Sequence, residues 1–111
     1  ELEWDGRDPE CLHLLALDED HQPIGTARLM PGGRIGRMAV LTAHRGQGIG
    51  GRLLRELMGL ARDRGQTALE LHAQTHALAF YRRFGFEPSG EEYLEAGIPH
   101  RRMVCRLDSS E

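Results

Sequence analysis

Apolar and polar residues in the first third of the chain follow each other in short runs, as they do in β-strands. Apolar runs at residues 11–17 and 24–30 flank a polar turn, which predicts an antiparallel hairpin. Residues 34–41 predict a third strand. Strict alternation divides its side chains between two faces, with Ile35, Arg37 and Ala39 on one and Met38 and Val40 on the other.

The period of the pattern changes after residue 48. Apolar residues then recur at helical spacing, which predicts an amphipathic helix over residues 49–64 that Gly65 ends. Residues 67–73 alternate and predict a strand. Residues 75–84 predict a second helix, with Thr75 as its N-cap.

The rest of the chain is predicted to be extended or irregular. Residues 86–88 begin an extended piece, residues 91–99 read as a charged loop with Gly and Pro, and residues 102–107 form a last strand. The order of elements predicts one domain over residues 1–111, of the α+β (mixed α/β) class. A sheet that opens with a meander cannot be doubly wound throughout.

Composition narrows the class of protein. The 111 residues are 40% apolar and 28% charged, with a net charge of −3, which gives no basic footprint for nucleic acid. No apolar run approaches the roughly 20 residues of a membrane span. Without a secretory signal, Cys11 and Cys105 are expected to stay reduced. These features predict a soluble, cytoplasmic protein with neither nucleic acid nor membrane as a partner.

The glycine-rich connection over residues 42–51 carries the strongest chemical signal. It follows a predicted strand and opens the long helix. A helix start presents unpaired N–H groups and the positive end of the helix dipole, and glycines let a phosphate approach the main chain. The connection therefore predicts an anion site.

Two common phosphate motifs overlap in this connection. Gly46-x-Gly48-x-x-Gly51 has the spacing of the dinucleotide fingerprint, with Glu70 about where the ribose-binding acid would lie. A Rossmann domain would open with this unit, however, and here three strands precede it. The same glycines followed by Arg52 imitate a P-loop but lack its Lys and its magnesium-binding hydroxyl.

A third motif leads to a family. Arg45-x-x-Gly48-x-Gly50 resembles the pyrophosphate loop of the GNAT N-acetyltransferases, and residues 77–86 (ALAFYRRFGF) are similar to the family's A-x-x-F-Y-x-x-x-G-F segment. Both stand in the family's order, with a predicted strand between them. Residues 97–100, Gly-Ile-Pro-His, are similar to a stretch near the end of a small bacterial branch. The resemblance runs from residue 11 to residue 107.

This resemblance implies a GNAT fold: a central, mostly antiparallel sheet with a splayed pair of fourth and fifth strands and flanking helices. Residues 34–41 would be the fourth strand. The family's first strand and two helices precede the hairpin, so the chain is expected to lack them. Trp4, Asp5 and Asp8 would then border the acceptor site, near which residues 96–100 would also run.

The resemblance also implies transfer of acetyl from acetyl-CoA to a primary amine of a small molecule or peptide, with no metal. Many members are dimeric, so a homodimer is a further expectation. The cofactor would lie on the glycine loop and along the fourth strand, with Gln74 standing where the family often has Asn. The implied cofactor-binding residues are Met38, Val40, Arg45, Gly46, Gln47, Gly48, Ile49, Gly50, Gly51 and Gln74.

Tyr81 is the candidate acid. Attack of an amine on a thioester expels a thiolate, and a phenol with a pKa of about 10 is protonated at neutral pH and can donate to it. In the family the equivalent Tyr has this role. Phe80, Phe84 and Phe86 are expected to be core residues.

The proton acceptor for the amine is not fixed by the sequence. Many family members use a Glu on the fourth strand, but residues 34–41 contain no carboxylate. The candidates are Glu70, His72, His13, His100 and water. The missing Glu leaves an alternative function, a non-catalytic acyl-CoA-binding module that acts as a sensor or dimerisation partner.

Overall fold

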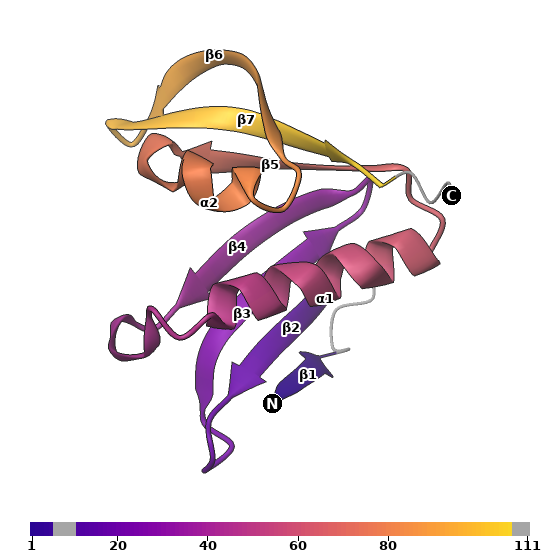
Figure 1. Ribbon diagram of the computed structural model, residues 1–111, viewed down its shortest axis with the longest axis vertical. Coiled ribbons are helices and arrows are strands. Elements are labelled where there is room, and N and C mark those ends of the chain that lie inside the picture. Colours follow the sequence, from indigo (N-terminus) through magenta and orange to yellow (C-terminus); the bar gives the residue numbers. More distant parts are fainter. Residues whose placement is uncertain (6–10, 108–111) are drawn as a thin grey trace.

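The computed structural model describes residues 1–5 and 11–107, and Figure 1 shows its arrangement. Its elements are β1 (Leu2–Asp5), β2 (Leu12–Leu17), β3 (Pro23–Met30), β4 (Arg34–Val40), η1 (Thr42–His44), α1 (Ile49–Asp63), β5 (Ala68–Gln74), η2 (Thr75–Ala77), α2 (Leu78–Arg82), β6 (Glu87–Glu95) and β7 (Ile98–Arg106). The strands form one sheet in the order β1-β2-β3-β4-β5-β7-β6. Among the described strands only β4 and β5 pair in parallel, so the predicted mostly antiparallel mixed sheet is confirmed.

The core lies between the sheet and α1, which crosses β2, β3 and β4 in Figure 1. Leu53, Leu54, Leu57 and Ala61 recur on one face of α1 and are fully buried. The helix predicted over residues 49–64 is confirmed, with its end one residue earlier. Gly65, with a φ of 84°, follows that end as predicted, because a left-handed residue lets the chain turn away from a helix. In the described residues no helix is long and apolar enough to cross a membrane.

The two halves of the sheet meet only at one end. β4 and β5 pair at Arg34 and Glu70, and the Glu70 N–H donates to the Gly33 carbonyl at 2.8 Å. Beyond this point the strands diverge toward Val40 and Gln74, as Figure 1 shows. The splayed pair that the family resemblance implied is therefore present, and it opens toward the end of β4 that leads into α1.

The side chains of β4 do not alternate as predicted. Arg28 on β3 pairs with Gly36 and Thr26 with Ala39, so β4 has one extra residue between these pairs. This β-bulge switches the face on which the following side chains lie. Ile35 is buried before the bulge, whereas after it Ala39 is exposed and Met38 and Val40 pack against the core.

The prediction of a loop at residues 91–99 is wrong. β6 and β7 form a long hairpin there, and the turn between them is Ala96 and Gly97, with φ of 54° and 77°. Positive φ at both turn residues is typical of two-residue hairpin turns. Pro99 fits within β7 because it lies one residue beyond the last pair with β5, where no N–H is needed.

Two smaller differences concern helix and strand ends. The second helix is the short turn η2 followed by α2, and η2 has no side-chain cap, so Thr75 does not cap it as predicted. The sequence pattern did not predict β1, which pairs with β2 at the sheet edge through Leu2 and Ala16. Trp4 lies on this edge strand, with β2 and β3 between it and β4, and Asp8 lies outside the described residues.

Candidate functional site

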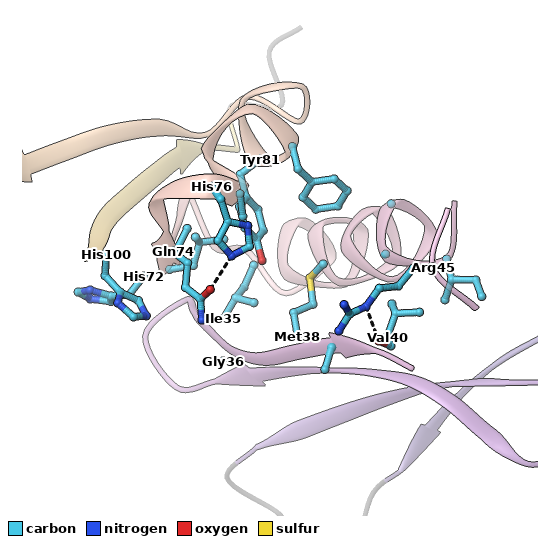
Figure 2. A pocket seen from close by; sticks show the side chains of 18 of the residues that line it. Ile35, Gly36, Met38, Val40, Arg45, His72, Gln74, His76, Tyr81 and His100 are labelled. Atoms are coloured by element: carbon cyan, nitrogen blue, oxygen red, sulfur yellow. Dashed lines mark hydrogen bonds between the residues drawn. The ribbon is translucent and has the colours of Figure 1, made fainter. Parts of the chain in front are cut away.

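A cavity of about 1090 Å³ occupies the gap where β4 and β5 separate. Its walls come from β4, β5, the connection before α1, and α2, as Figure 2 shows from close by. A cavity of this volume is in the range of sites that hold whole small-molecule ligands. The splay of the sheet therefore creates a candidate ligand site.

The connection before α1 supplies main-chain donors to one end of this cavity. Gly46 and Gly48 have φ of 82° and 78°, a region that favours glycine. α1 begins after Gly48 with no side-chain cap and with no acidic residue in its first turn. The N–H groups of Ile49, Gly50 and Gly51 therefore have no helical acceptor and carry the positive end of the dipole. This is the geometry of an anion site.

Glycine also lets α2 pack against the first turn of α1. A Cβ at Gly50 would lie 3.5 Å from the Phe80 ring, and one at Gly51 would lie 3.1 Å from the Phe84 ring. The second distance is shorter than an ordinary carbon contact. Close packing of the two helices brings the next residue of α2, Tyr81, to the same cavity.

Arg45 ties the connection to the end of β4. Its Nε donates a hydrogen bond to the Val40 carbonyl at 3.1 Å (Figure 2). The Val40 carbonyl is therefore already engaged within this chain. Met38 points from β4 into the cavity in Figure 2, beside the position of Gly50.

A second hollow of about 690 Å³ adjoins the first at Gly48 and Gly51. All the charged residues in its lining are arginines: Arg55, Arg62 and Arg83. The Arg55 guanidinium lies 5.4 Å from the Phe84 ring centroid and the Arg83 guanidinium 5.8 Å from that of Phe80. Sequence reasoning missed this cationic surface, because arginines on an amphipathic helix usually face solvent without a ligand.

Tyr81 directs its hydroxyl into the first cavity, toward Met38 in Figure 2. Its ring packs edge-on against Phe80, with centroids 5.0 Å apart, and against Phe86, with centroids 6.0 Å apart. Burial raises the pKa of the Tyr81 phenol above its usual 10.0. The group is therefore a hydrogen-bond donor throughout the physiological pH range.

The cavity reaches both faces of the sheet. Alternate residues of β5 are buried on the side that α1 and α2 cover: Leu69, Leu71 and Ala73. Glu70, His72 and Gln74 point to the opposite face. Both sets contribute to the lining, as does Tyr81 from the helical side. The space between β4 and β5 thus connects the helix-covered face with a polar face on which the described residues place no helix.

Glu70 and His72 on the polar face are held by neighbouring side chains. Glu70 Oε1 accepts a hydrogen bond from Arg102 Nη2 at 3.2 Å, and this bond lowers the pKa of the Glu70 carboxyl. His72 Nδ1 lies 2.5 Å from the Tyr93 hydroxyl, and its Nε2 lies 3.7 Å from Glu70 Oε2. Partial burial and the Glu95 charge raise the pKa of Tyr93, so its hydroxyl remains a donor to His72. With Nδ1 accepting from Tyr93, the neutral His72 ring carries its hydrogen on Nε2, near Glu70.

His100 lies beside this group and is only 8% exposed. Its Nδ1 is 2.7 Å from the Ile98 carbonyl oxygen, and its ring stacks on Tyr93 with centroids 5.8 Å apart. A carbonyl can only accept a hydrogen bond, so Nδ1 carries the hydrogen. His100 also lines the cavity, at the end opposite Arg45 in Figure 2.

The remaining candidates divide between the cavity and the surface. Gln74 lines the cavity, with its Oε1 2.6 Å from His76 Nε2, so its NH₂ group stays available. Gln47 is exposed and is not among the lining residues. His13 lies on β2 opposite Arg28 of β3, and it too is outside the lining.

Known proteins resemble this chain in both sequence and fold. A family model described as "Acetyltransferase (GNAT) domain" matches residues 8–107. The chain belongs to the GNAT acetyltransferase family. The uncharacterized N-acetyltransferase YjcF of Bacillus subtilis is 37% identical over 108 residues, which cover 94% of this chain and 76% of that protein.

Solved GNAT structures resemble this GNAT domain closely. An acyl-CoA N-acyltransferase from Pseudomonas aeruginosa matches with a TM-score of 0.74 at 37% identity, over 86% of this chain and 68% of that one. A GNAT family acetyltransferase from Elizabethkingia anophelis, solved with acetyl-CoA bound, shares the fold with a TM-score of 0.74 at 23% identity, over 88% of this chain and 77% of that one. The family and fold expected from the two motifs are thus confirmed.

The GNAT topology explains why the dinucleotide fingerprint is a chance match. Glu70 lies near the start of β5, beside Arg34 at the start of β4. The glycine connection follows Val40, at the other end of β4. In a dinucleotide site the acid lies at the same end of the sheet as the glycine turn. Here Glu70 bonds Arg102 instead.

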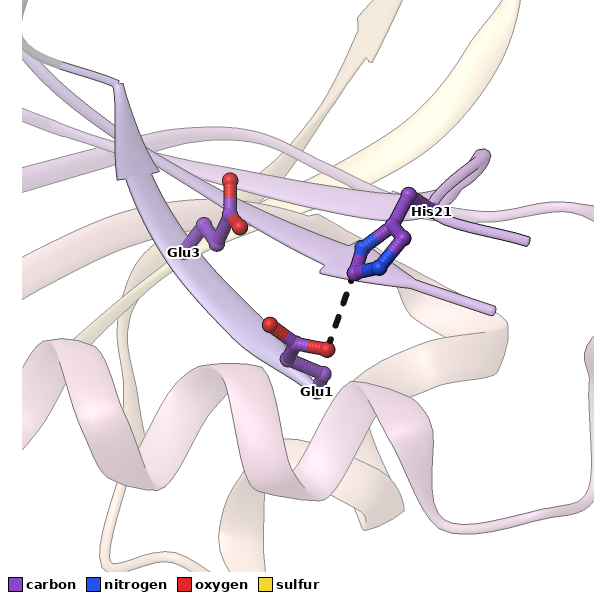
Figure 3. A group of neighbouring side chains, drawn as sticks. All are labelled: Glu1, Glu3 and His21. Carbon is purple, nitrogen blue, oxygen red and sulfur yellow. Dashed lines mark ion pairs between the residues drawn. The ribbon is translucent and has the colours of Figure 1, made fainter. Parts of the chain in front are cut away.

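One group of side chains in this GNAT domain has the spacing of metal ligands. Ligand atoms of Glu1, Glu3 and His21 lie within 4.8 Å of one another, as Figure 3 shows. All three residues are exposed, and the His21–Glu1 pair at 3.9 Å accounts for their proximity. The group lies at the β1 edge of the sheet, away from the cavity, so it has no part in the chemistry considered there.

Proposed function

We propose that this GNAT domain transfers an acetyl group from acetyl-CoA to a primary amine of a small molecule or peptide. The observation that carries the proposal is the cavity in which uncapped main-chain donors of α1 and the Tyr81 hydroxyl meet. The main-chain donors would bind the diphosphate of the donor, and the Tyr81 hydroxyl would donate to the departing thiolate. The amine would come from the polar face of the sheet.

Support for acetyl-CoA as the donor comes from the shape and charge of the two hollows. The diphosphate fits the N–H groups of residues 48–51, which line the cavity at a helix start whose first turn has no acidic residue. The pantetheine arm would then follow the gap beside Met38 toward Tyr81. The nucleotide carries a further phosphate, and Arg55 and Arg83 offer cations in the adjoining hollow. The Elizabethkingia structure, which has the same fold and was solved with acetyl-CoA bound, supports this donor.

The chemistry assigned to Tyr81 follows from its buried phenol. As the amine forms the new C–N bond and the C–S bond breaks, the sulfur gains negative charge and the Tyr81 O–H donates to it. A phenol is a weaker acid than a thiol, so the phenolate left on Tyr81 is the stronger base and must be reprotonated. The proton comes from the nitrogen, which loses it as the amide forms. A positioned donor of this kind contributes about 10²–10⁴ in rate.

A thiol-release assay tests the proposal. The protein is mixed with acetyl-CoA and a panel of primary amines, and free thiol is followed with a chromogenic reagent while mass spectrometry identifies the N-acetyl product. The proposal expects amine-dependent thiol release with matching product. Binding of acetyl-CoA by calorimetry without turnover on any amine would instead support a non-catalytic acyl-CoA-binding module. Binding of NAD without binding of CoA would contradict both.

A further inference from the structure

The four side chains that the sequence offered as proton acceptors are not equivalent in the structure. His13 lies outside the cavity. Glu70 is bonded to Arg102, and this bond lowers the pKa of its carboxyl, so it is a weak base. His72 has Tyr93 on one ring nitrogen and Glu70 near the other. Only His100 combines a place in the cavity lining with a ring nitrogen that these contacts leave available.

The hydrogen bond to Ile98 fixes which nitrogen of His100 is available. Nδ1 donates to the Ile98 carbonyl at 2.7 Å, so in the neutral ring Nε2 bears a lone pair and no hydrogen. Stacking on Tyr93 holds the plane of the ring. A ring that is oriented by a bond at one nitrogen, with a lone pair on the other and a place in the lining of a substrate cavity, can act as a general base.

The position of His100 also fits the path of an amine. Gln74, His100 and Tyr93 are direct partners across β5, β7 and β6, so their side chains share the polar face. Tyr81 approaches the cavity from the helical face. An amine that enters from the polar face would therefore meet His100 on its way to an acyl group beside Tyr81. The two proton-transfer groups would then act from opposite sides of the sheet.

On the basis of the proposed function, we infer that His100 Nε2 accepts the proton that the acceptor ammonium must lose before it attacks the thioester. The neutral amine then forms the C–N bond, the C–S bond breaks, and the sulfur takes the phenolic proton of Tyr81. The proton lost by the nitrogen restores Tyr81. His100 releases its own proton to solvent, so one proton leaves per acetyl group transferred.

Other titratable groups surround His100 and would shape its pH response. The elements packed against β7 are β5, β6 and η2, and the titratable or charged residues that they and β7 bring to this end of the cavity are Glu70, His72, His76, Tyr93, Glu95 and Arg102. When the histidines and Tyr93 are neutral, the two carboxylates and the one guanidinium of this group leave a negative charge. A fall of kcat/KM at acidic pH must therefore be assigned to a residue by substitution, since the pH of its midpoint would not identify the group.

The first test compares two substitutions with a matched control. His100→Asn can keep a donor to the Ile98 carbonyl but has no Nε2, and His100→Gln has an amide of little basicity near Nε2. Each should lower kcat/KM for the best amine of the panel by about 10²–10⁴ at pH 7. The dissociation constant of acetyl-CoA, measured by calorimetry, should stay within about twofold of wild type, which also verifies folding. His13→Asn, a histidine outside the cavity, should change neither value.

The pH profile supplies a readout that a structural role would not change. In the wild type, kcat/KM should fall as pH falls, because a protonated imidazole cannot accept a proton. The limb assigned to His100 should be missing in both variants. A weakly basic aromatic amine, already neutral at pH 7, should lose far less rate than an alkyl amine. Variants that keep the wild-type limb would overturn the inference and favour water or His72.

The tautomer can be measured without any acceptor. Two-bond ¹H–¹⁵N correlation spectra of the wild-type protein should show His100 protonated at Nδ1 and bare at Nε2, and a ring protonated at Nε2 would overturn the inference. These outcomes separate the two levels of the account. If no amine is acetylated, the proposed function fails whatever the tautomer. If acetylation proceeds and His100 variants keep the full rate, only the role of His100 fails.

Discussion

The two ends of the cavity are built in different ways. The end beside α1 consists mainly of backbone: glycines with positive φ and the uncapped N–H groups of a helix start. The end beside β5 and β7 consists of side chains from residues distant in the chain, where Tyr93 contacts both His72 and His100. A site made of backbone groups suits a ligand that is always the same, such as a diphosphate. A side-chain site can change its ligand with few substitutions, so the acceptor is expected to be set there.

The largest expected effect would come from Tyr81, which lies between the two ends. Tyr81→Phe removes the hydroxyl and keeps the ring contacts with Phe80 and Phe86. We expect kcat to fall by about 10²–10⁴, because the thiolate loses its proton donor. Thiol release measured in the steady state reports the change. An unchanged kcat, with chemistry shown to be rate-limiting by single turnover, would remove Tyr81 from the mechanism.

The backbone end should respond to a single methyl group. Gly48 has a φ of 78°, and a Cβ added there would meet nothing within 4 Å, so Gly48→Ala adds conformational strain without a clash. An alanine with a left-handed backbone is strained by roughly 1–2 kcal/mol. If the empty loop relieves this strain and the ligand-bound loop does not, acetyl-CoA should bind about 5–30-fold more weakly. Calorimetry measures the affinity.

Gly59 offers the matched control for Gly48. It lies inside α1, also with nothing within 4 Å, but its backbone is helical. Gly59→Ala should leave acetyl-CoA affinity unchanged and raise the free energy of unfolding by about 0.5–1 kcal/mol, because alanine favours the helix. Equal losses of affinity in the two variants would mean that the connection does not hold the ligand.

The cationic hollow should contribute a smaller part of donor affinity. Arg83→Gln removes one of its three guanidinium groups and the contact with the Phe80 ring. For an exposed charge pair worth about 0.5–1 kcal/mol, acetyl-CoA should bind roughly 2–5-fold more weakly. The variant should bind the 3′-dephospho form as well as wild type does. An equal loss for both ligands would show that Arg83 does not meet that phosphate.

The smallest effect concerns the Glu70–Arg102 pair at the other end. Its bond lowers the pKa of Glu70 in the folded protein below the ordinary 4.5. The stabilisation is therefore present above that pH and disappears as pH falls through the lowered folded value. With side chains 29% and 42% exposed, the pair should be worth a few tenths of a kcal/mol to about 1 kcal/mol.

Urea unfolding of Arg102→Gln and wild type can test this pair. The difference in the free energy of unfolding between them should be largest near pH 7 and should shrink toward pH 3, where Glu70 is protonated. A difference independent of pH would mean that Arg102 stabilises the sheet through its bond to Ser89 rather than through charge.

The backbone end could be predicted from sequence because its signals are local. A strand, a glycine cluster and a helical repeat follow one another within residues 34–64, and each has its own pattern. Ten residues of a second motif placed Tyr81 on the following helix. The splay between β4 and β5 came with the family resemblance, since no local pattern encodes the single point where these strands pair.

The side-chain end could not be predicted in the same way. It depends on the β6–β7 hairpin, whose Gly and Pro residues resemble those of a loop, and whose turn includes an alanine with positive φ. Pairing of Gln74, His100 and Tyr93 is a long-range register that sequence periodicity does not contain. The same limit hid the bulge in β4, which reversed the faces of Met38 and Val40 relative to Ile35.

A crystal structure of the protein with acetyl-CoA tests the central claim most directly. We expect diphosphate oxygens at hydrogen-bond distance, about 2.7–3.2 Å, from main-chain N–H groups of residues 48–51. We also expect the thioester sulfur next to the Tyr81 hydroxyl and the acetyl group at the gap between β4 and β5. A diphosphate bound elsewhere, or a Tyr81 hydroxyl turned away from the sulfur, would contradict it.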